Sequence, residues 1–547
     1  MSENAFPRLN DRTRGWLRFI WDKATTRDDW TSAGTPNPWW DRTSTSPFCT
    51  FPRFDLHETG YLLPLLCDVT PAWREGYTRI GDELVGRFTT FWGAIDWLTM
   101  VGHDPNADKY PPEWLFYLPE HLRGRYDAPG WTANGVAPWG LQPDPIGSDG
   151  YNFFRGFFNL LIGFYDYVCN DQKWANPFKV AGYQDRLFEW DRHRLVQFMH
   201  DQWAERPAGV HCENTKIWPF CVSGAGLSLK MYDNLYHTDM SYLFGDWVEF
   251  ARKHYMKFDK RGELEWFAFF YDPLEKTVFR LYDEASAYAS LCVTPYVYPQ
   301  DKKLGALLYE TSVRALGWND PKKPLIEFHP DPRWALIMLL MSRELGDHVT
   351  EERLRTLAER DYEPRFFGDD DDYFGWFFKN GEEWPRGQLA ALAMLGEVGE
   401  PGAWTRVFDQ PNLTKFDEPT VEGIEFPTLG VAQAWNDNTA GALWVETYPA
   451  TSAARGQRTT WRVTQLPAAG DVSVVCDGSD FTAWRAIGQS TIEIDTDVDH
   501  HVFRIDTGFH GAAGHATPTE VATEKRPGAP IKTLYTPASP CSASCCG

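Results

Sequence analysis

The chain has 547 residues, of which 53 are Lys or Arg and 76 are Asp or Glu, so the formal net charge is −23. An acidic chain lacks the basic footprint that nucleic acid or an anionic membrane surface requires, so we expect neither as a partner. The first residues contain no apolar run typical of a signal peptide, and no stretch approaches the roughly 18 apolar residues of a transmembrane helix. We therefore expect a cytoplasmic protein.

Apolar residues recur at helical spacing through most of the first 400 residues or so. We expect helices at residues 7–24, 72–98, 152–169, 185–203, 223–236, 241–257, 303–316, 333–345, 351–360 and 386–397. The stretch 153–168, FFRGFFNLLIGFYDYV, is apolar nearly all round and predicts a buried helix. Helices that follow one another in this way favour a mainly α fold, an α/α toroid or barrel whose inner helices surround a cavity.

Two segments depart from this helical pattern. Residues 102–148 are rich in Pro, Gly and Trp, which indicates either a lid or pocket wall, or a plain surface excursion. After about residue 420, short alternating stretches bounded by turn residues predict a small antiparallel β domain. We therefore divide the chain into an α/α barrel at 1–420, a β-rich domain at 421–512 and a flexible, Ala/Pro/Thr/Ser-rich tail at 513–547.

Two cysteines lie nine positions apart in HCENTKIWPFC, residues 211–221. We expect Cys212 and Cys221 to be thiols, because disulfides are rare in a reducing compartment. The chain has no paired CxxC motifs and no CxxC followed by HxxxH, so we expect no metal site. Buried thiols are common in protein cores, but a thiol whose pKa is tuned is also a general acid, a general base or a nucleophile.

The stretch FPRFDLHETGYLLPL, residues 51–65, places Asp55, His57, Glu58 and Tyr61 within two helical turns. Asp55 and Tyr61 lie six positions apart, so both could approach one cavity from the end of a helix. The alternative is that Asp55 caps a helix and Tyr61 is an ordinary core residue.

Together these stretches resemble the linalool dehydratase/isomerase family over residues 45–345. The loop and the helix after it, LSLKMYDNL, resemble the family's catalytic loop, which has a Cys-Glu…Cys pattern with the same interval. Asp55 and Tyr61 match the family's Asp-(five residues)-Tyr spacing. The segment TPAWREGY, residues 70–77, places Tyr77 on another active-site tyrosine of the family.

The resemblance implies an (α/α)6 barrel that uses no metal or organic cofactor and assembles as a homo-oligomer. It also implies dehydration of tertiary allylic alcohols, such as linalool to myrcene, and isomerisation of geraniol to linalool. The catalytic residues it suggests are Asp55, Tyr61, Tyr77, Cys212 and Cys221. The residues it suggests for substrate binding are Phe153, Phe157, Glu213, Trp218 and Phe220.

Loss of water needs an acid at the departing hydroxyl and a base at the carbon that loses a proton. Our hypothesis is that Cys212 protonates the hydroxyl or relays a proton to it, and that Cys221 with Asp55 takes the carbon proton. A thioether formed by either cysteine is an alternative.

The chain departs from the family pattern at three positions: Phe157 replaces a histidine, Phe153 replaces a methionine, and Ala285 falls where the family has a tyrosine. We therefore expect a small apolar alcohol, either a terpene alcohol or a small alkenol, rather than linalool itself.

Two other functional readings are open. One is a carbohydrate-active enzyme, a glycosidase or polysaccharide lyase, with Asp55, Glu58 and Glu213 as its carboxylates. The other is a non-catalytic protein that binds an apolar ligand.

Overall fold

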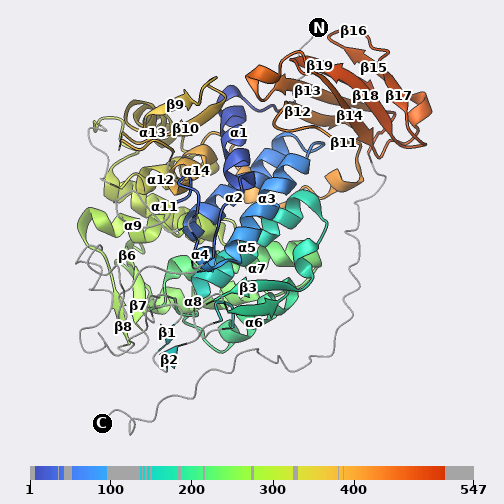
Figure 1. Ribbon diagram of the computed structural model, residues 1–547. Helices are drawn as coiled ribbons and strands as arrows, with labels where there is room; N and C mark the ends of the chain where they lie inside the picture. The colour runs from blue at the N-terminus through green and yellow to red at the C-terminus, as the bar shows by residue number, and fades with distance from the viewer. Residues whose placement is uncertain are drawn as a thin grey trace.

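The computed structural model describes residues 6–31, 33–34, 36–41, 52–94, 136–137, 140–141, 144–147, 151–182, 186–212, 216–272, 276–324, 331–379, 381–385, 387–398 and 400–511. The described chain is mainly α-helical, with small separate sheets (Figure 1). The predicted mainly α class is therefore confirmed. The insert at 102–148 and the tail at 513–547 lie almost entirely outside the described residues.

The helices form the larger part of the molecule, drawn from blue to yellow in Figure 1. Their bounds are α1 Asp11–Thr25, α2 Pro52–Val69, α3 Glu75–Phe88, α4 Phe91–Ala94, α5 Asn152–Cys169, α6 Arg192–Ala204, α7 Pro219–Tyr236, α8 Tyr242–His254, α9 Ser286–Leu291, α10 Thr294–Val297, α11 Lys302–Leu316, α12 Arg333–Leu345, α13 His348–Asp361, α14 Gly387–Leu395 and α15 Ala403–Asp409. Among the described helices, none combines the length and the apolar character needed to cross a bilayer.

Helices α5 and α7 pack tightly at the centre of this helical part. A Cβ atom on Gly156 would lie 3.0 Å from the Cα of Ala225, and one on Gly224 would lie 2.5 Å from the ring of Phe157. Glycine at both positions therefore allows the two helices to approach closely. Every residue of α5 except Cys169 at its end is buried, as its all-round apolar pattern predicts.

The predicted helices agree closely with the structure at α5 and α12, whose bounds match to the residue. The segment predicted as a helix at 185–203 begins instead as a strand, β4 Leu187–Trp190, which pairs with β3 Phe178–Ala181. The predicted helix 241–257 likewise ends early, because β5 Met256–Phe258 follows α8 and pairs with β6 Leu264–Phe267. Three further hairpins complete the helical part: β1 Val136–Ala137 with β2 Gly140–Leu141, β7 Phe270–Asp272 with β8 Thr277–Phe279, and β9 Pro364–Phe367 with β10 Tyr373–Trp376.

The alternating stretches after residue 420 form two antiparallel sheets, drawn in orange and red in Figure 1. One sheet has the order β11-β14-β18-β17 and the other has the order β12-β13-β19-β15-β16. The strands are β11 Thr420–Glu422, β12 Leu429–Asp437, β13 Ala442–Pro449, β14 Arg458–Thr464, β15 Ser473–Cys476, β16 Ser479–Asp480, β17 Trp484–Ala486, β18 Ile492–Asp497 and β19 His501–Asp506.

Backbone hydrogen bonds join the start of the chain to these late strands. The N–H of Leu9 donates to the carbonyl of Ala432 at 2.8 Å, and the side-chain amide of Gln433 donates to the carbonyl of Phe6 at 2.9 Å. The N–H of Ala72 donates to the carbonyl of Ala434 at 3.1 Å. The five-stranded sheet therefore rests on the segment before α1 and on the turn between α2 and α3.

Candidate active site, an apolar cavity lined by eight helices

A cavity of about 170 Å³ lies among the helices of the larger part. Its lining comes from α2, α5, α7, α9, α10, α12, α14 and α15 and from residues at their ends. Most of the lining is apolar, and its large aromatic side chains are Phe54, Phe153, Trp218, Phe220, Phe269 and Trp404. A cavity with this lining favours an apolar ligand whose orientation is fixed by a few polar groups.

Cys221 lines this cavity from the first turn of α7. Pro219 occupies the first position of the helix, where its fixed φ angle and missing N–H are tolerated, and this starts α7 just before the thiol. The carbonyl of Cys221 accepts a hydrogen bond of 3.2 Å from the side-chain amide of Asn152 on α5. The thiol side chain is buried, so it is shielded from bulk water.

Cys212 is also buried but lies outside the cavity lining. The backbone N–H of Phe153, in the first turn of α5, donates to its sulfur at 2.8 Å. The second thiol therefore lies at the positive end of α5, where it contacts the backbone of Phe153, whose side chain lines the cavity. Glu213, in the same loop, lies outside the described residues.

Tyr61 on α2 and Tyr296 on α10 contact each other at the cavity, although they lie far apart in the sequence. Their hydroxyl oxygens lie 3.1 Å apart, and both residues line the cavity. Burial raises the pKa of both hydroxyls well above their ordinary value, so both are protonated at neutral pH. Negative charge on Glu58, Cys292 or Cys221 would raise the pKa of Tyr296 further, and this interaction places all three side chains near its hydroxyl.

Glu58 supplies a buried carboxyl group to the same cavity. Its Oε1 accepts a hydrogen bond of 2.9 Å from the side-chain amide of Gln388 on α14. Burial raises the pKa of Glu58 well above its ordinary value, because the charged form loses its hydration in an apolar environment. A raised pKa favours the protonated form of Glu58, which can donate a proton into the cavity.

The helical spacing of α2 explains why Glu58 rather than Asp55 reaches the cavity. Phe54, Glu58 and Tyr61 follow one another at intervals of four and three residues, so they share one face of the helix, and all three line the cavity. This spacing is visible in the sequence and identifies Glu58 as a candidate acid. Asp55 lies on another face of the helix.

Asp55 is fully buried and paired with Lys23 from α1. The ammonium of Lys23 donates to both carboxylate oxygens at 2.7 Å, and the backbone N–H of Asp41 and the hydroxyl of Thr59 donate at 3.0 and 3.1 Å. These donors satisfy the carboxylate within the protein interior. Asp55 is absent from the cavity lining.

Asp55 is nevertheless connected to Glu58 through the start of α14. Asp41, whose N–H binds Asp55, accepts hydrogen bonds of 3.2 Å from the backbone N–H groups of Gly387 and Gln388. A Cβ atom on Gly387 would lie 2.0 Å from the carboxyl carbon of Asp55, so glycine is required for this close approach. The side chain of Gln388 in turn donates to Glu58. Asp55 and Asp41 therefore fix the start of α14 and, through Gln388, the position of Glu58.

Tyr77 lies apart from the cavity. Its hydroxyl shares a 2.7 Å hydrogen bond with that of Thr70, and its ring packs edge-on against Trp73. The structure does not bring it together with Tyr61 and Cys221.

Phe157, where the resembling family has a histidine, does not itself line the cavity, but its ring contacts Phe153 and Phe220, which do. The ring of His57 stacks on Phe157, with centroids 4.5 Å apart. Burial lowers the pKa of His57 well below its ordinary value, so the imidazole is neutral. A histidine from α2 thus packs against the position where the family carries one on α5.

Four further polar residues in the lining were not among the site residues predicted from the sequence: Tyr288, Cys292, Arg333 and Gln388. Tyr288 lies on α9 and Cys292 directly follows that helix, while Arg333 lies on α12 and Gln388 on α14. All four are far along the chain from the loop with the two cysteines. No local motif marks them, because only the packing of the helices brings them to one cavity.

Comparison with known proteins gives a family match and matches among solved structures. The family model described as linalool dehydratase/isomerase matches residues 138–370, which is less than half of the chain and extends from before α5, through the loop with both cysteines, to the end of β9 just after α13. Asp55, Glu58 and Tyr61 precede the matched segment.

Among solved structures, a GH127 β-arabinofuranosidase matches with a probability of 0.90 and 8% sequence identity. The match covers 89% of this chain and 74% of that chain, with a TM-score of 0.23. A likeness at this level supports no conclusion about fold or function. The family match confirms the resemblance read from the cysteine loop, and residues 138–370 are similar to the linalool dehydratase/isomerase family.

Proposed function

We propose that the protein is a hydro-lyase that removes water from a small tertiary or allylic alcohol bound in the apolar cavity. The observation that carries this proposal is the buried carboxyl group of Glu58, which lines with Cys221 a cavity made mainly of aromatic and aliphatic side chains. Dehydration needs an acid at the hydroxyl, a proton acceptor near the neighbouring carbon, and little bulk water.

The size of the cavity favours a small alkenol as the substrate. Its volume of about 170 Å³ is slightly larger than the roughly 150 Å³ apolar cavity that takes up benzene in an engineered protein. An alkenol near that size would place its hydroxyl at the polar groups and its hydrocarbon part against the aromatic rings. A longer terpene alcohol would need side chains of the lining to move.

In the first step we propose that Glu58 donates its proton to the substrate hydroxyl. The carbon–oxygen bond then breaks, water leaves, and an allylic cation and the Glu58 carboxylate remain. The faces of Phe153, Trp218 and Phe220 are available to stabilise the cation, each by about 1–2 kcal/mol in a desolvated site. The guanidinium of Arg333, which lowers the pKa of Glu58, stabilises the carboxylate as it forms.

In the second step the cation loses a proton from the adjacent carbon, which gives the alkene. We propose that Cys221 receives this proton as its own thiol proton moves to Tyr296, and that the hydroxyl pair of Tyr296 and Tyr61 returns a proton to the Glu58 carboxylate. Every group then regains its starting protonation state, so the cycle needs no added reductant or oxidant. The same cation also allows isomerisation. If water adds to the other end of the allylic cation and returns a proton to Glu58, the product is the isomeric alcohol.

Asp55 takes a positioning role in this proposal, through Asp41 and the start of α14. Cys212 contacts the backbone of Phe153, and Tyr77 has a structural role outside the cavity. The same proposal includes three features that the family resemblance implies or the sequence predicts: an (α/α)6 arrangement of the helices, a homo-oligomer and a cytoplasmic location.

The carbohydrate-active alternative has less support from the described residues. Glycosidases of the usual kind place two carboxyl groups on either side of the bond they cleave. Of the residues that line the described cavity, Glu58 alone carries a carboxyl group, and Asp55 is paired with Lys23 outside it. The strongly apolar lining also lacks the many hydrogen-bonding groups that a sugar requires.

The test is a headspace gas-chromatographic assay of alkene release from a panel of tertiary and allylic alcohols of increasing chain length. We expect alkene from the wild type and a loss of at least a hundredfold in Cys221→Ala, the scale of a lost proton-transfer group. Cys67→Ala is the matched control, because Cys67 is also a buried thiol but lies outside the cavity lining. Alkene release that both variants retain, or a folded wild type that releases none, would contradict the proposal.

A further inference from the structure

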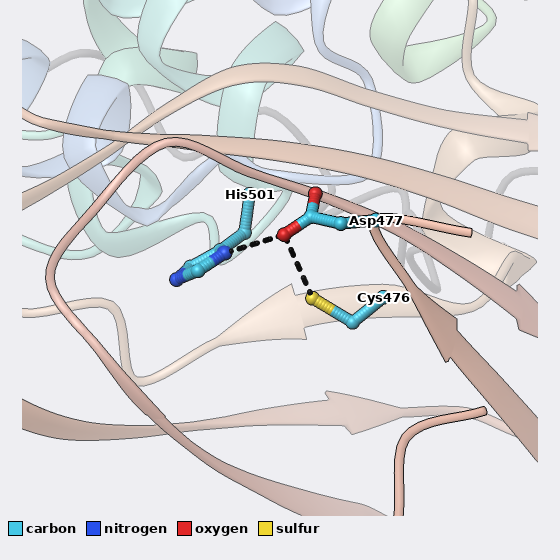
Figure 2. Close-up of side chains that lie close together, drawn as sticks. All are labelled: Cys476, Asp477 and His501. Carbon is cyan, nitrogen blue, oxygen red and sulfur yellow. Dashed lines mark hydrogen bonds and ion pairs between the residues drawn. The ribbon is translucent and has the colours of Figure 1, made fainter. Parts of the chain in front are cut away.

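Three possible metal ligands lie together at one end of the five-stranded sheet, far from the cavity. Cys476 ends β15, Asp477 follows it in the turn to β16, and His501 begins β19. Figure 2 shows one carboxylate oxygen of Asp477 between the ring of His501 and the sulfur of Cys476. Their ligand atoms all lie within 4.8 Å of one another, a grouping that no other such side chains show in the described part of the chain.

We propose that Cys476, Asp477 and His501 bind a divalent metal ion of the zinc type, with solvent in the fourth position. A thiolate, an imidazole and a carboxylate are each common ligands of Zn²⁺, and three protein ligands with one open position are typical of accessible zinc sites.

The distances between the ligand atoms fit a tetrahedral ion. Bond lengths of about 2.3 Å to sulfur and 2.0–2.1 Å to nitrogen and oxygen place a sulfur and an oxygen ligand about 3.5 Å apart, and a nitrogen and an oxygen ligand about 3.3 Å apart. The sulfur of Cys476 lies 3.6 Å from Oδ2 of Asp477. Nδ1 of His501 lies 2.8 Å from the same oxygen, so the metal would separate these two atoms by about half an ångström.

The backbone holds these ligands in place before any metal binds. Cys476 pairs with Phe503 across β15 and β19, and with Ser479 across the hairpin to β16. Between the hairpin strands, Asp477 and Gly478 both have positive φ angles, 50° and 81°, as a tight two-residue hairpin turn requires. The N–H of Val502 donates to Oδ1 of Asp477 at 2.9 Å, which directs Oδ2 toward the cysteine and histidine.

The outer nitrogen of His501 supplies an independent argument. Nε2 lies 3.2 Å from Oδ1 of Asp497, while Nδ1 faces Asp477. Histidines that bind metals usually donate their second ring N–H to a carboxylate, which fixes the tautomer and the ring orientation. Asp497 holds His501 in this way, with Nδ1 left to face the proposed ion.

The competing explanation is a protonated His501 that forms ion pairs with Asp477 and Asp497 without any metal. The two explanations differ in the role of the thiol. An ion-paired histidine needs no cysteine, whereas a metal site would use the Cys476 sulfur as a ligand and produce a metal–thiolate signal.

The test is a titration of the full-length, reduced and metal-stripped protein with Co²⁺, followed by displacement with Zn²⁺. We expect one equivalent to give a thiolate-to-cobalt charge-transfer band that Zn²⁺ abolishes. Cys476→Ser should lose the band. Asp497→Asn should keep it but weaken binding by about 10–100-fold, the usual effect of removing the carboxylate behind a ligating histidine.

Two controls exclude other thiols as the source of the signal. Cys169→Ser replaces another partly buried cysteine near an aspartate, Asp171, and should leave the titration unchanged. A variant in which Cys541, Cys545 and Cys546 are all serine should also bind normally. A band that survives Cys476→Ser, disappears with the terminal cysteines, or never forms in the wild type would overturn the proposal. If circular dichroism shows that Cys476→Ser does not fold, the folded Asp497→Asn variant provides the test. A Co²⁺ affinity equal to that of the wild type in Asp497→Asn would also overturn the proposal.

Discussion

The hydroxyl oxygens of Tyr61 and Tyr296 lie 3.1 Å apart, although 235 positions separate the two residues in the chain. Tyr61 follows Glu58 by one helical turn on α2, and Tyr296 lies on α10 near Cys221. The pair therefore joins the two walls of the cavity that carry the proposed acid and the proposed proton acceptor. Proton return between these walls depends on both hydroxyls.

Replacing either tyrosine with phenylalanine should therefore interrupt the same step. We expect Tyr61→Phe and Tyr296→Phe each to lower kcat about tenfold, the equivalent of a hydrogen bond worth about 1.4 kcal/mol. The double variant should cost no more than either single variant, because the relay is already broken. Tyr309→Phe, which removes a hydroxyl bound to Asp347 outside the cavity, should leave kcat unchanged. Additive losses in the double variant would contradict a shared role.

Glu58→Gln should lower kcat by about 10²–10⁴-fold, because the amide cannot donate an acid proton. The same change should raise stability at pH 7. Burial raises the pKa of Glu58 in the folded state. Between pH 4.5 and that raised pKa, the unfolded chain has released this proton while the folded chain retains it. Folding is therefore penalised increasingly as the pH rises from 4.5 to the raised pKa.

The stability gain of Glu58→Gln should accordingly be present at pH 7 and disappear below about pH 4.5. Urea unfolding of both proteins at several pH values measures this difference, and headspace chromatography measures the activity. A variant that is less stable than the wild type at pH 7 would show that Glu58 is ionised in the folded protein.

The ion pair of Lys23 and Asp55 gives a third prediction. Lys23→Met should destabilise the protein by about 3–5 kcal/mol, because it leaves a buried carboxylate without its cation. Adding Asp55→Asn to Lys23→Met should recover most of this loss, since the remaining amide carries no charge. Urea unfolding of the single and double variants measures both effects. A double variant that is no more stable than Lys23→Met would rule out the charge as the cause.

The size of the cavity gives a fourth prediction, tested on two leucines of α14. Leu392 lines the cavity, whereas Leu389 on the same helix is buried outside it. Both Leu392→Ala and Leu389→Ala should cost about 2–5 kcal/mol of stability. Leu392→Ala alone should shift kcat/KM toward alcohols with longer hydrocarbon chains. An equal shift in both variants would indicate general loosening of the helices rather than a larger substrate site.

How much of this molecule could be predicted from its sequence depends on the range of the interactions involved. The bounds of α5 and α12 follow from helical spacing, and the prediction matched both to the residue. The strand β4 was mistaken for the start of a helix. It has only four residues, too few to show a clear strand periodicity, and its pairing with β3 is not visible in its own sequence. The late strands β13, β14, β15, β18 and β19 were recognised from their alternation and turn residues.

The candidate site was harder to predict, because its polar groups meet only in three dimensions. Cys221 and Tyr61 could be selected from local stretches, and both line the cavity. The place of Asp55 depends on Lys23 in α1 and on Gly387 in α14, and no pattern within α2 shows either contact. The same reason hides the proposed metal site, since His501 lies 24 positions after Asp477 and joins it only by strand pairing.

The hydrogen bonds between the segment before α1 and the strand β12 also bear on how the protein forms in the cell. The side-chain amide of Gln433 donates to the carbonyl of Phe6, 427 positions earlier in the chain, so this contact forms only after β12 has been synthesised. Contacts of such sequence separation slow folding, because a long loop must close before they form. The segment before α1 therefore stays without these hydrogen-bond partners until β12 has been made.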